Sequence, residues 1–228
     1  MDERGLLHRR PSGWPRTTEG YGRRVRRIHP EPIGDIDPAE VVLDDDRPAP
    51  PGRPWVLVNM VTSVDGATTV GGRSGKLSGP VDRRVFRALR GCADMILVGA
   101  GTVRAEDYRP PRTPEDTIAT KRSIDGQDAR PRLVVVSASL DLDPEAPLFA
   151  DRESTDPPPI VATVTTAPAE RRARLEPVAE VMACGETCVD LTGLLAVLDD
   201  IGAVPCSVKA VLTSTTNWSP PASSTNYA

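Results

Sequence analysis

The stretch 56–108 constrains the fold more than any other part of this 228-residue chain. It contains two short apolar runs, Val56–Met60 and Met95–Val98, and each is followed by glycine and small polar residues. Runs of this length and composition predict buried strands rather than helices. Between them, 81–90 has apolar residues at helical spacing directly after a Gly-Pro pair, which predicts a helix. The stretch therefore reads as a strand, loop, helix, strand unit whose two strands run parallel as a pair.

A unit of this kind places the carboxyl ends of its strands at one edge of the sheet, where ligands of α/β proteins bind. The residues that follow the first run include Ser-Val-Asp-Gly at 63–66, and those that follow the second are Gly-Ala-Gly-Thr-Val-Arg at 99–104. We therefore expect the functional site where these two segments meet.

The chain beyond this unit continues to alternate between strand and helix patterns. Further strands are predicted at 132–138, 160–164 and 178–183, and helices at 166–175 and 190–201, whereas 109–130 is polar and predicts a long loop over the site. The alternation predicts an α/β fold with a mainly parallel sheet and helices on both faces.

Composition narrows the function classes. The mean hydropathy of −0.29 and the lack of a long apolar run predict no membrane span, and the N-terminus has no apolar secretion signal, so we expect a cytoplasmic protein. The net charge of −4 argues against nucleic-acid binding, although the first 27 residues carry eight arginines. The spacing of the four cysteines does not match a zinc site, so we expect no metal and reduced thiols.

Three motifs together resemble the pyrimidine reductase family of riboflavin biosynthesis. They are SVDG, GKLSGPVDRRVFRALRGCADMILVG and GAGTVRAEDY, and the likeness covers 53–203. The resemblance implies a dihydrofolate-reductase-like fold, NADPH as cofactor, and reduction of the ribosyl chain of 5-amino-6-(5-phosphoribosylamino)uracil, a small phosphorylated pyrimidine. It leaves a homodimer open. The HxE and CxxC motifs of the zinc deaminase domain that is fused to some members are absent from this sequence.

The resemblance also implies roles for individual residues. Asp65 would orient the substrate or assist protonation, although an aspartate at this position could equally brace a turn. The pattern Gly-Ala-Gly lacks the third glycine of a dinucleotide fingerprint, so by spacing alone it fits a plain tight turn as well. The expected catalytic residue is Asp65, the expected cofactor-binding residues are Val61, Lys76, Gly99, Gly101, Thr102 and Glu106, and the expected substrate-binding residues are Ser74 and Arg90.

The resemblance stops at residue 203. Where the family has a strand and a Gly-Gly turn of the form VLxEGGPxL, this chain has VPCSVKAVL. Possible codons for 204–228, read in another frame, permit Val-Leu-Cys-Glu-Gly-Gly-Pro-Asn-Leu, which is what the family would have here. We therefore expect that the reading frame shifts near 202–204, either in nature or by sequencing error.

This reading divides the chain into a disordered basic arm and Pro-rich lead-in (1–52), an incomplete reductase domain without its C-terminal strands (53–203), and an out-of-frame, disordered tail (204–228). A chain of this kind is expected to be inactive or poorly folded. Three interpretations remain: a pyrimidine reductase, a pterin or dihydrofolate reductase, and a non-catalytic remnant.

Overall fold

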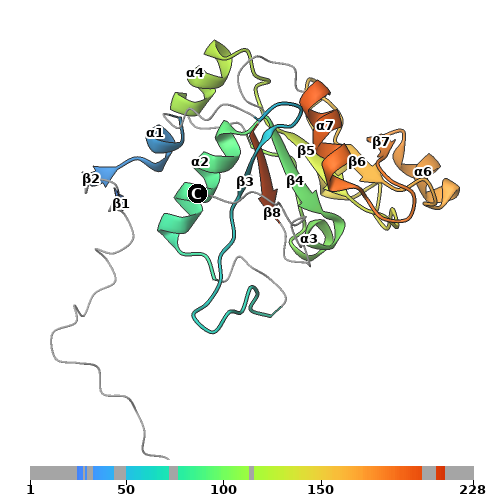
Figure 1. Cartoon of the computed structure of the whole chain (residues 1–228), viewed down its shortest axis with the longest axis horizontal. Helices are drawn as coiled ribbons and strands as arrows, with labels where there is room; N and C mark the ends of the chain where they lie inside the picture. Colours follow the sequence, from blue (N-terminus) through green and yellow to red (C-terminus); the bar gives the residue numbers. More distant parts are fainter. Residues whose placement is uncertain are drawn as a thin grey trace, which may run out of the picture.

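A six-stranded parallel sheet forms the centre of the protein, in the order β3-β8-β4-β5-β6-β7 (Figure 1). The computed structural model describes residues 25–27, 29, 33–43, 50–71, 77–112, 116–201 and 209–213. The strands are β3 (Trp55–Val58), β4 (Met95–Gly99), β5 (Arg132–Val136), β6 (Ile160–Thr163), β7 (Glu180–Ala183) and β8 (Lys209–Thr213).

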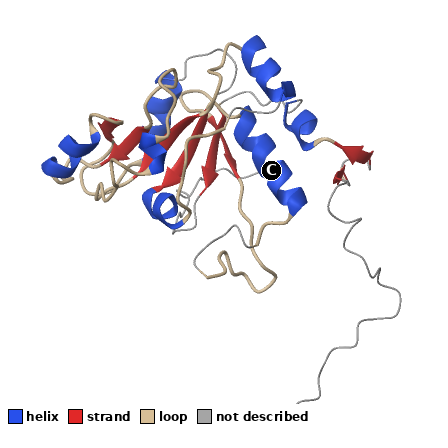
Figure 2. Ribbon diagram, turned by 180° about the vertical axis from the view of Figure 1, so that it is seen from behind, coloured by secondary structure: helices blue, strands red, loops and turns tan. Residues whose placement is uncertain are grey.

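Successive side chains of a strand point to opposite faces of the sheet, so the central strands contribute to two separate cores. Ile96, Val98 and Val135 pack with residues of α3 (Ala100–Ala105), α5 (Pro147–Ala150) and α6 (Ala169–Leu175). Leu97 and Val134 point to the opposite face, where they pack with α7 (Leu191–Ile201). The sheet is therefore covered by helices on both faces, which confirms the predicted fold class (Figure 2).

The N-terminal elements lie beside this sheet. Strands β1 (Val25–Arg27) and β2 (Ile33–Ile36) form an antiparallel pair and lead into α1 (Pro38–Leu43). Helix α1 packs through Val42 and Leu43 against a small core that α2 (Pro80–Cys92) and α4 (Asp116–Ile124) build together. None of the helices in the described part of the chain has the length and apolar composition of a membrane span.

Most predicted elements are confirmed with small changes in their ends, but the predicted loop at 109–130 is wrong. Helix α4 lies within it. Two buried residues anchor this helix, Ile118 and Arg122. Because one of them is an arginine, the sequence shows no amphipathic pattern. The helix predicted from 166 begins instead at Ala169, because the Thr166 hydroxyl donates to the Glu186 carbonyl (2.7 Å) and does not cap the helix.

The position of β8 corrects two further expectations. The two apolar runs, 56–60 and 95–98, were predicted to be neighbouring strands. In the structure, β8 lies between β3 and β4 and pairs with both in parallel. The expectation that no strand follows residue 203 is also wrong, because 209–213 forms this central strand. The rest of the expected tail, 204–208 and 214–228, lies outside the described residues.

Candidate functional site at the carboxyl edge of the sheet

The carboxyl ends of all six strands lie at one edge of the sheet because the strands are parallel. The Asp65 turn follows β3, and the Gly99 turn follows β4 and leads into α3. Because β8 separates β3 from β4, the ends of these two strands are two strand spacings apart, about 10 Å. The two predicted segments therefore share an edge, although they are not on adjacent strands. Figure 1 shows α3 at this edge.

Hydrogen bonds within the turn hold Asp65 in place. Its Oδ1 accepts a hydrogen bond from the Ser63 hydroxyl, whose oxygen accepts one from the Ala67 N–H (3.0 Å). Gly66 closes the turn with φ of +85° and donates its N–H to the Ser63 carbonyl (2.9 Å). The Ser63 hydroxyl, followed by the backbone N–H of Ala67, lowers the pKa of Asp65. Asp65 is thus an exposed carboxylate that braces its turn.

The glycine turn exposes its backbone and buries its threonine. Gly99 is half-buried and precedes α3, whereas Gly101 is exposed, and a Cβ built on it would meet no atom within 4 Å. Thr102 is only 5% exposed, so its side chain faces the protein interior. Glu106 is half-buried at the end of α3, where its N–H bonds to the Thr102 carbonyl (3.0 Å). Of these four residues, Gly101 is the exposed one, so its backbone is the most open to a ligand.

Arg90 is held between two aromatic rings. It lies in the last turn of α2, and its guanidinium is 5.2 Å from the ring centres of both Phe86 and Tyr108. It also donates a hydrogen bond to the Tyr108 hydroxyl. These contacts tie α2 to the segment after α3. A guanidinium has five N–H donors, so this arrangement leaves donors for a phosphate.

The remaining predicted residues are on the segment between β3 and α2. Val61 is half-buried and lies between the end of β3 and the Asp65 turn. Ser74 and Lys76 fall outside the described residues, so their predicted contacts with substrate and cofactor stay predictions.

Ser137 is a candidate that the sequence reasoning missed. It directly follows β5 and is 4% exposed, and its hydroxyl has no hydrogen-bond partner among the described residues. Gly99 pairs with Val136, so Ser137 lies one strand spacing from the glycine turn. A buried polar atom without a partner is costly and marks a place where a ligand could supply the missing bond. The signal available in the sequence was a serine directly after an apolar strand.

The described residues contain no group of three or more His, Cys, Asp or Glu side chains that could hold a metal ion. Cys92 and Cys184 are buried and Cys188 is exposed, and none of the three forms a disulfide within the described part of the chain. Burial, and to a lesser extent Asp190, raises the pKa of Cys184, so this thiol stays protonated.

Comparison with known proteins places these features in a family. A family model described as the RibD C-terminal domain matches residues 54–220. The chain is 35% identical over 147 residues to a 2,5-diamino-6-ribosylamino-4(3H)-pyrimidinone 5′-phosphate reductase of Archaeoglobus fulgidus, and 32% identical over 150 residues to a protein of the same name from Methanothermobacter thermautotrophicus. The matches cover 64% and 66% of this chain and 65% and 64% of the relatives, so the chain spans slightly less than two thirds of their length.

Solved structures agree on the fold. A pyrimidine reductase-like protein from Corynebacterium diphtheriae superposes with a TM-score of 0.66 at 25% identity, over 78% of this chain and 73% of that chain. RibD of Acinetobacter baumannii gives a TM-score of 0.52 at 18% identity, over 72% of this chain and 40% of that chain, a likeness that concerns the fold alone. The fold is therefore the dihydrofolate-reductase-like α/β fold of RibD-type reductases.

Proposed function

This chain belongs to the RibD C-terminal domain family, and on that basis we propose that it uses NADPH to reduce the ribosyl chain of a 5′-phosphorylated ribosylaminopyrimidine. The substrate would be 5-amino-6-(5-phosphoribosylamino)uracil or the related 2,5-diamino-pyrimidinone. The observation that carries the proposal is the family match over residues 54–220, supported by relatives whose names state this reaction.

The residues at the carboxyl edge fit a nicotinamide dinucleotide. Open space above Gly101 would allow a phosphate to approach the backbone closely. The Ser137 hydroxyl, one strand away, has no partner among the described residues and could bond to the cofactor. Gly99 and Gly101 would form the floor of this site. When bound, NADPH supplies a hydride to C1 of the ring-opened ribosylamine, and the protein fixes the position and charge of the substrate.

Asp65 would orient the substrate and not donate a proton to it. Its hydrogen bonds hold it as a carboxylate with a lowered pKa, so it would accept a hydrogen bond from a substrate hydroxyl or amine. Arg90, already braced by Tyr108, would contribute a guanidinium to the substrate phosphate. Val61, Thr102, Glu106, Ser74 and Lys76 keep their proposed places in the site on the family resemblance alone.

The reading frame determines how complete this site is. Strand β8 lies between β3 and β4, so its carboxyl end at Thr213 lies between the strand ends that lead into the Asp65 turn and the Gly99 turn. The chain as written has Val-Lys-Ala-Val-Leu at 208–212, where the alternative frame of the same codons permits Glu-Gly-Gly-Pro. We propose that the frame shift removes a glycine turn that would contact the cofactor, and that it lowers activity.

An NADPH oxidation assay with both pyrimidines, run on this chain and on a frame-restored version, tests both parts. We expect the restored protein to oxidise NADPH with a pyrimidine substrate. The rate of the chain as written should be lower by about a hundredfold, because a small misplacement of the reacting groups has an effect of that size. Equal rates would contradict the role of the frame shift. Oxidation with dihydrofolate or a pterin, but with neither pyrimidine, would contradict the proposed substrate. Failure of the restored protein to bind NADPH would identify a non-catalytic remnant.

A further inference from the structure

The chain changes direction directly after α3, and this turn brings Tyr108 to Arg90. Asp107 has φ of +50°, a left-handed conformation that aspartate tolerates better than most residues. The Tyr108 N–H then donates to the Val103 carbonyl (3.0 Å), and the half-buried Tyr108 ring packs against the core on the α3 face of the sheet. Both the backbone and the ring of Tyr108 are therefore fixed by the folded domain.

Arg90 approaches this tyrosine from a different element, the last turn of α2. Its guanidinium lies 5.2 Å from the ring centres of both Phe86 and Tyr108, and it donates a hydrogen bond to the Tyr108 hydroxyl. Phe86 lies one turn earlier on the same helix, so it moves together with Arg90. Tyr108 is 18 residues away in the sequence and ties the guanidinium to a separate part of the fold.

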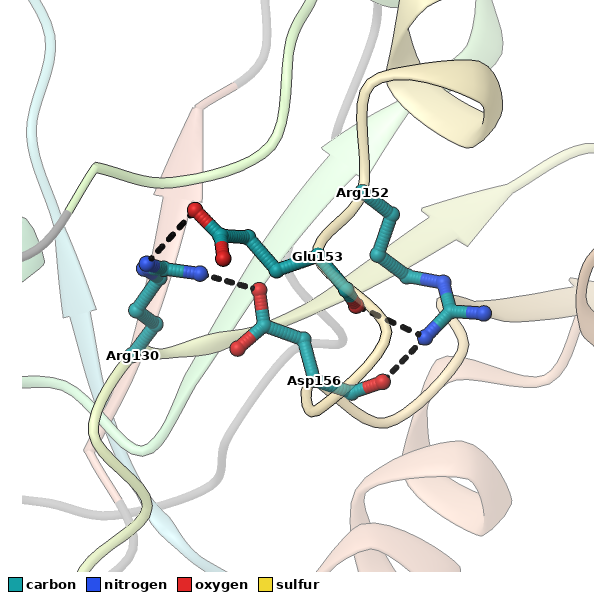
Figure 3. Close-up of polar contacts among 4 residues, drawn as sticks. All are labelled: Arg130, Arg152, Glu153 and Asp156. Atoms are coloured by element: carbon teal, nitrogen blue, oxygen red, sulfur yellow. Dashed lines mark hydrogen bonds and ion pairs between the residues drawn. The ribbon is translucent and has the colours of Figure 1, made fainter.

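Figure 3 shows another way in which this protein holds its arginines, through oxygen atoms of acidic residues. Arg130 pairs with the carboxylates of Asp156 (2.6 Å) and Glu153 (3.2 Å), and Arg152 donates to the main-chain carbonyls of the same two residues. At Arg90 the contacts are instead two aromatic rings and a hydroxyl. Because these groups are uncharged, they fix the orientation of the guanidinium without offsetting its charge as a carboxylate would.

A guanidinium held in this way is suited to a phosphate monoester. Such a phosphate carries about 1.5 to 2 negative charges at neutral pH, and a guanidinium can bind it through two parallel N–H donors when the two groups are correctly oriented. An arginine side chain that is free to rotate loses conformational entropy when it binds. Because Tyr108 already restricts Arg90 in the folded chain, less entropy is lost when the phosphate arrives.

We infer that Tyr108 is a positioning residue, which holds the Arg90 guanidinium in the orientation that receives the 5′-phosphate of the substrate. The inference rests on the proposed function, in which Arg90 meets that phosphate, and it assigns a role to a residue that acts through Arg90. Tyr108 follows α3, and α3 begins directly after Gly99. The same tyrosine therefore also fixes Arg90 relative to the glycine turn that is proposed to hold the cofactor.

Calorimetric titrations of the full 228-residue chain test this role, with each proposed pyrimidine used with and without its 5′-phosphate. We expect Tyr108→Leu to weaken binding of the phosphorylated compound by about tenfold and of the dephosphorylated compound by less than about twofold, because only the phosphate is bound through Arg90. Tyr108→Phe keeps the ring in the core and loses only the hydroxyl, so it should weaken binding of the phosphorylated compound by about threefold. This variant tests the inference even if Tyr108→Leu does not fold.

Two arginines of α2 provide the controls. Arg90→Met should weaken binding of the phosphorylated compound at least as strongly as Tyr108→Leu does. Arg87→Met should change neither affinity, because Arg87 is exposed on the same helix, about one turn before Arg90. If Tyr108 acts through Arg90, Tyr108→Leu should have no further effect on binding in the Arg90→Met background.

Three results would overturn the inference and leave the proposed function intact. They are equal weakening of both compounds in the Tyr108 variants, unchanged affinity in these variants, and additive losses in the variant that lacks both Tyr108 and Arg90. If the unaltered and the frame-restored chains bind neither phosphorylated pyrimidine, the proposed function itself fails, and this inference fails with it.

Discussion

Gly101 occupies a position where the folded chain does not require a glycine. Its φ is not in the left-handed region, and a Cβ there would meet open space. Within α3, glycine is in fact less favourable than alanine by about 0.5–1 kcal/mol, because it loses more backbone freedom on folding. This supports the proposal that a ligand approaches the backbone closely at Gly101.

Replacement of Gly101 by alanine should therefore separate stability from binding. We expect Gly101→Ala to raise the free energy of unfolding by up to about 1 kcal/mol in urea denaturation and to weaken NADPH binding by about tenfold, since the added methyl occupies the space proposed for the cofactor. Gly34→Ala is the control, because Gly34 in β2 also has open space around it but lies outside the six-stranded sheet. Unchanged NADPH affinity in Gly101→Ala would remove the glycine turn from the site.

Helix α4 depends on a buried arginine in place of an apolar face. Arg122 is 1% exposed, and its guanidinium donates to the carbonyls of Gly91 (2.9 Å), Ala93 (2.6 Å) and Asp128 (2.8 Å). Burial lowers the pKa of Arg122, while the charge of Asp94 acts in the opposite direction. The side chain thus satisfies carbonyls at the end of α2 and ahead of β4, and it fixes the helix against the domain.

Loss of these bonds should cost far more than loss of a surface ion pair on the same helix. We expect Arg122→Met to lower the free energy of unfolding by about 3 kcal/mol, because buried carbonyls lose their donors. Lys121→Met should cost at most about 1 kcal/mol, since the pair of Lys121 with Asp125 is partly exposed. Methionine suits a helix as well as lysine or arginine does, so helix propensity is matched. Equal losses in urea denaturation would show that the buried bonds contribute little.

The whole molecule depends on β8 for the continuity of its sheet. Strand β3 lies at one edge of the described sheet, where its partner is β8, which in turn pairs with β4. Without β8, the strand that leads into the Asp65 turn would have no ladder partner within the described sheet. Residues 209–213, which the sequence analysis placed outside the resemblance but which the family model includes, therefore join the two halves of the candidate site.

Val211 provides the test of this strand, because its backbone is paired with Leu57 on one side and Ile96 on the other. Proline at this position removes an N–H from a central ladder, so we expect Val211→Pro to lower the free energy of unfolding by about 3 kcal/mol or more. Hydrogen exchange at 55–58 should accelerate at the same time. Val211→Thr keeps the backbone bonds and the β-branched shape, so it should have little effect on exchange. Indistinguishable exchange in the two variants would contradict the central position of β8.

The sequence by itself determined the element types and the family, because both are written in local patterns. The short apolar run at 95–98, followed by glycine, favours a buried strand, and the Gly-Pro start with helical spacing predicts α2. Motifs at 63–66 and 99–104 pointed correctly to one edge of the sheet, since parallel strands end on the same side.

Only the tertiary structure decided which strands are neighbours and which polar residues are buried. The insertion of β8 between β3 and β4 is a pairing over more than 100 residues of chain, and no local pattern encodes it. The same holds for Arg122, whose guanidinium bonds to carbonyls about 30 residues away, and for Arg171 of α6, which donates to the Ser139 carbonyl after β5. Local chemistry sets what a segment can become, and long-range packing sets which partners it meets.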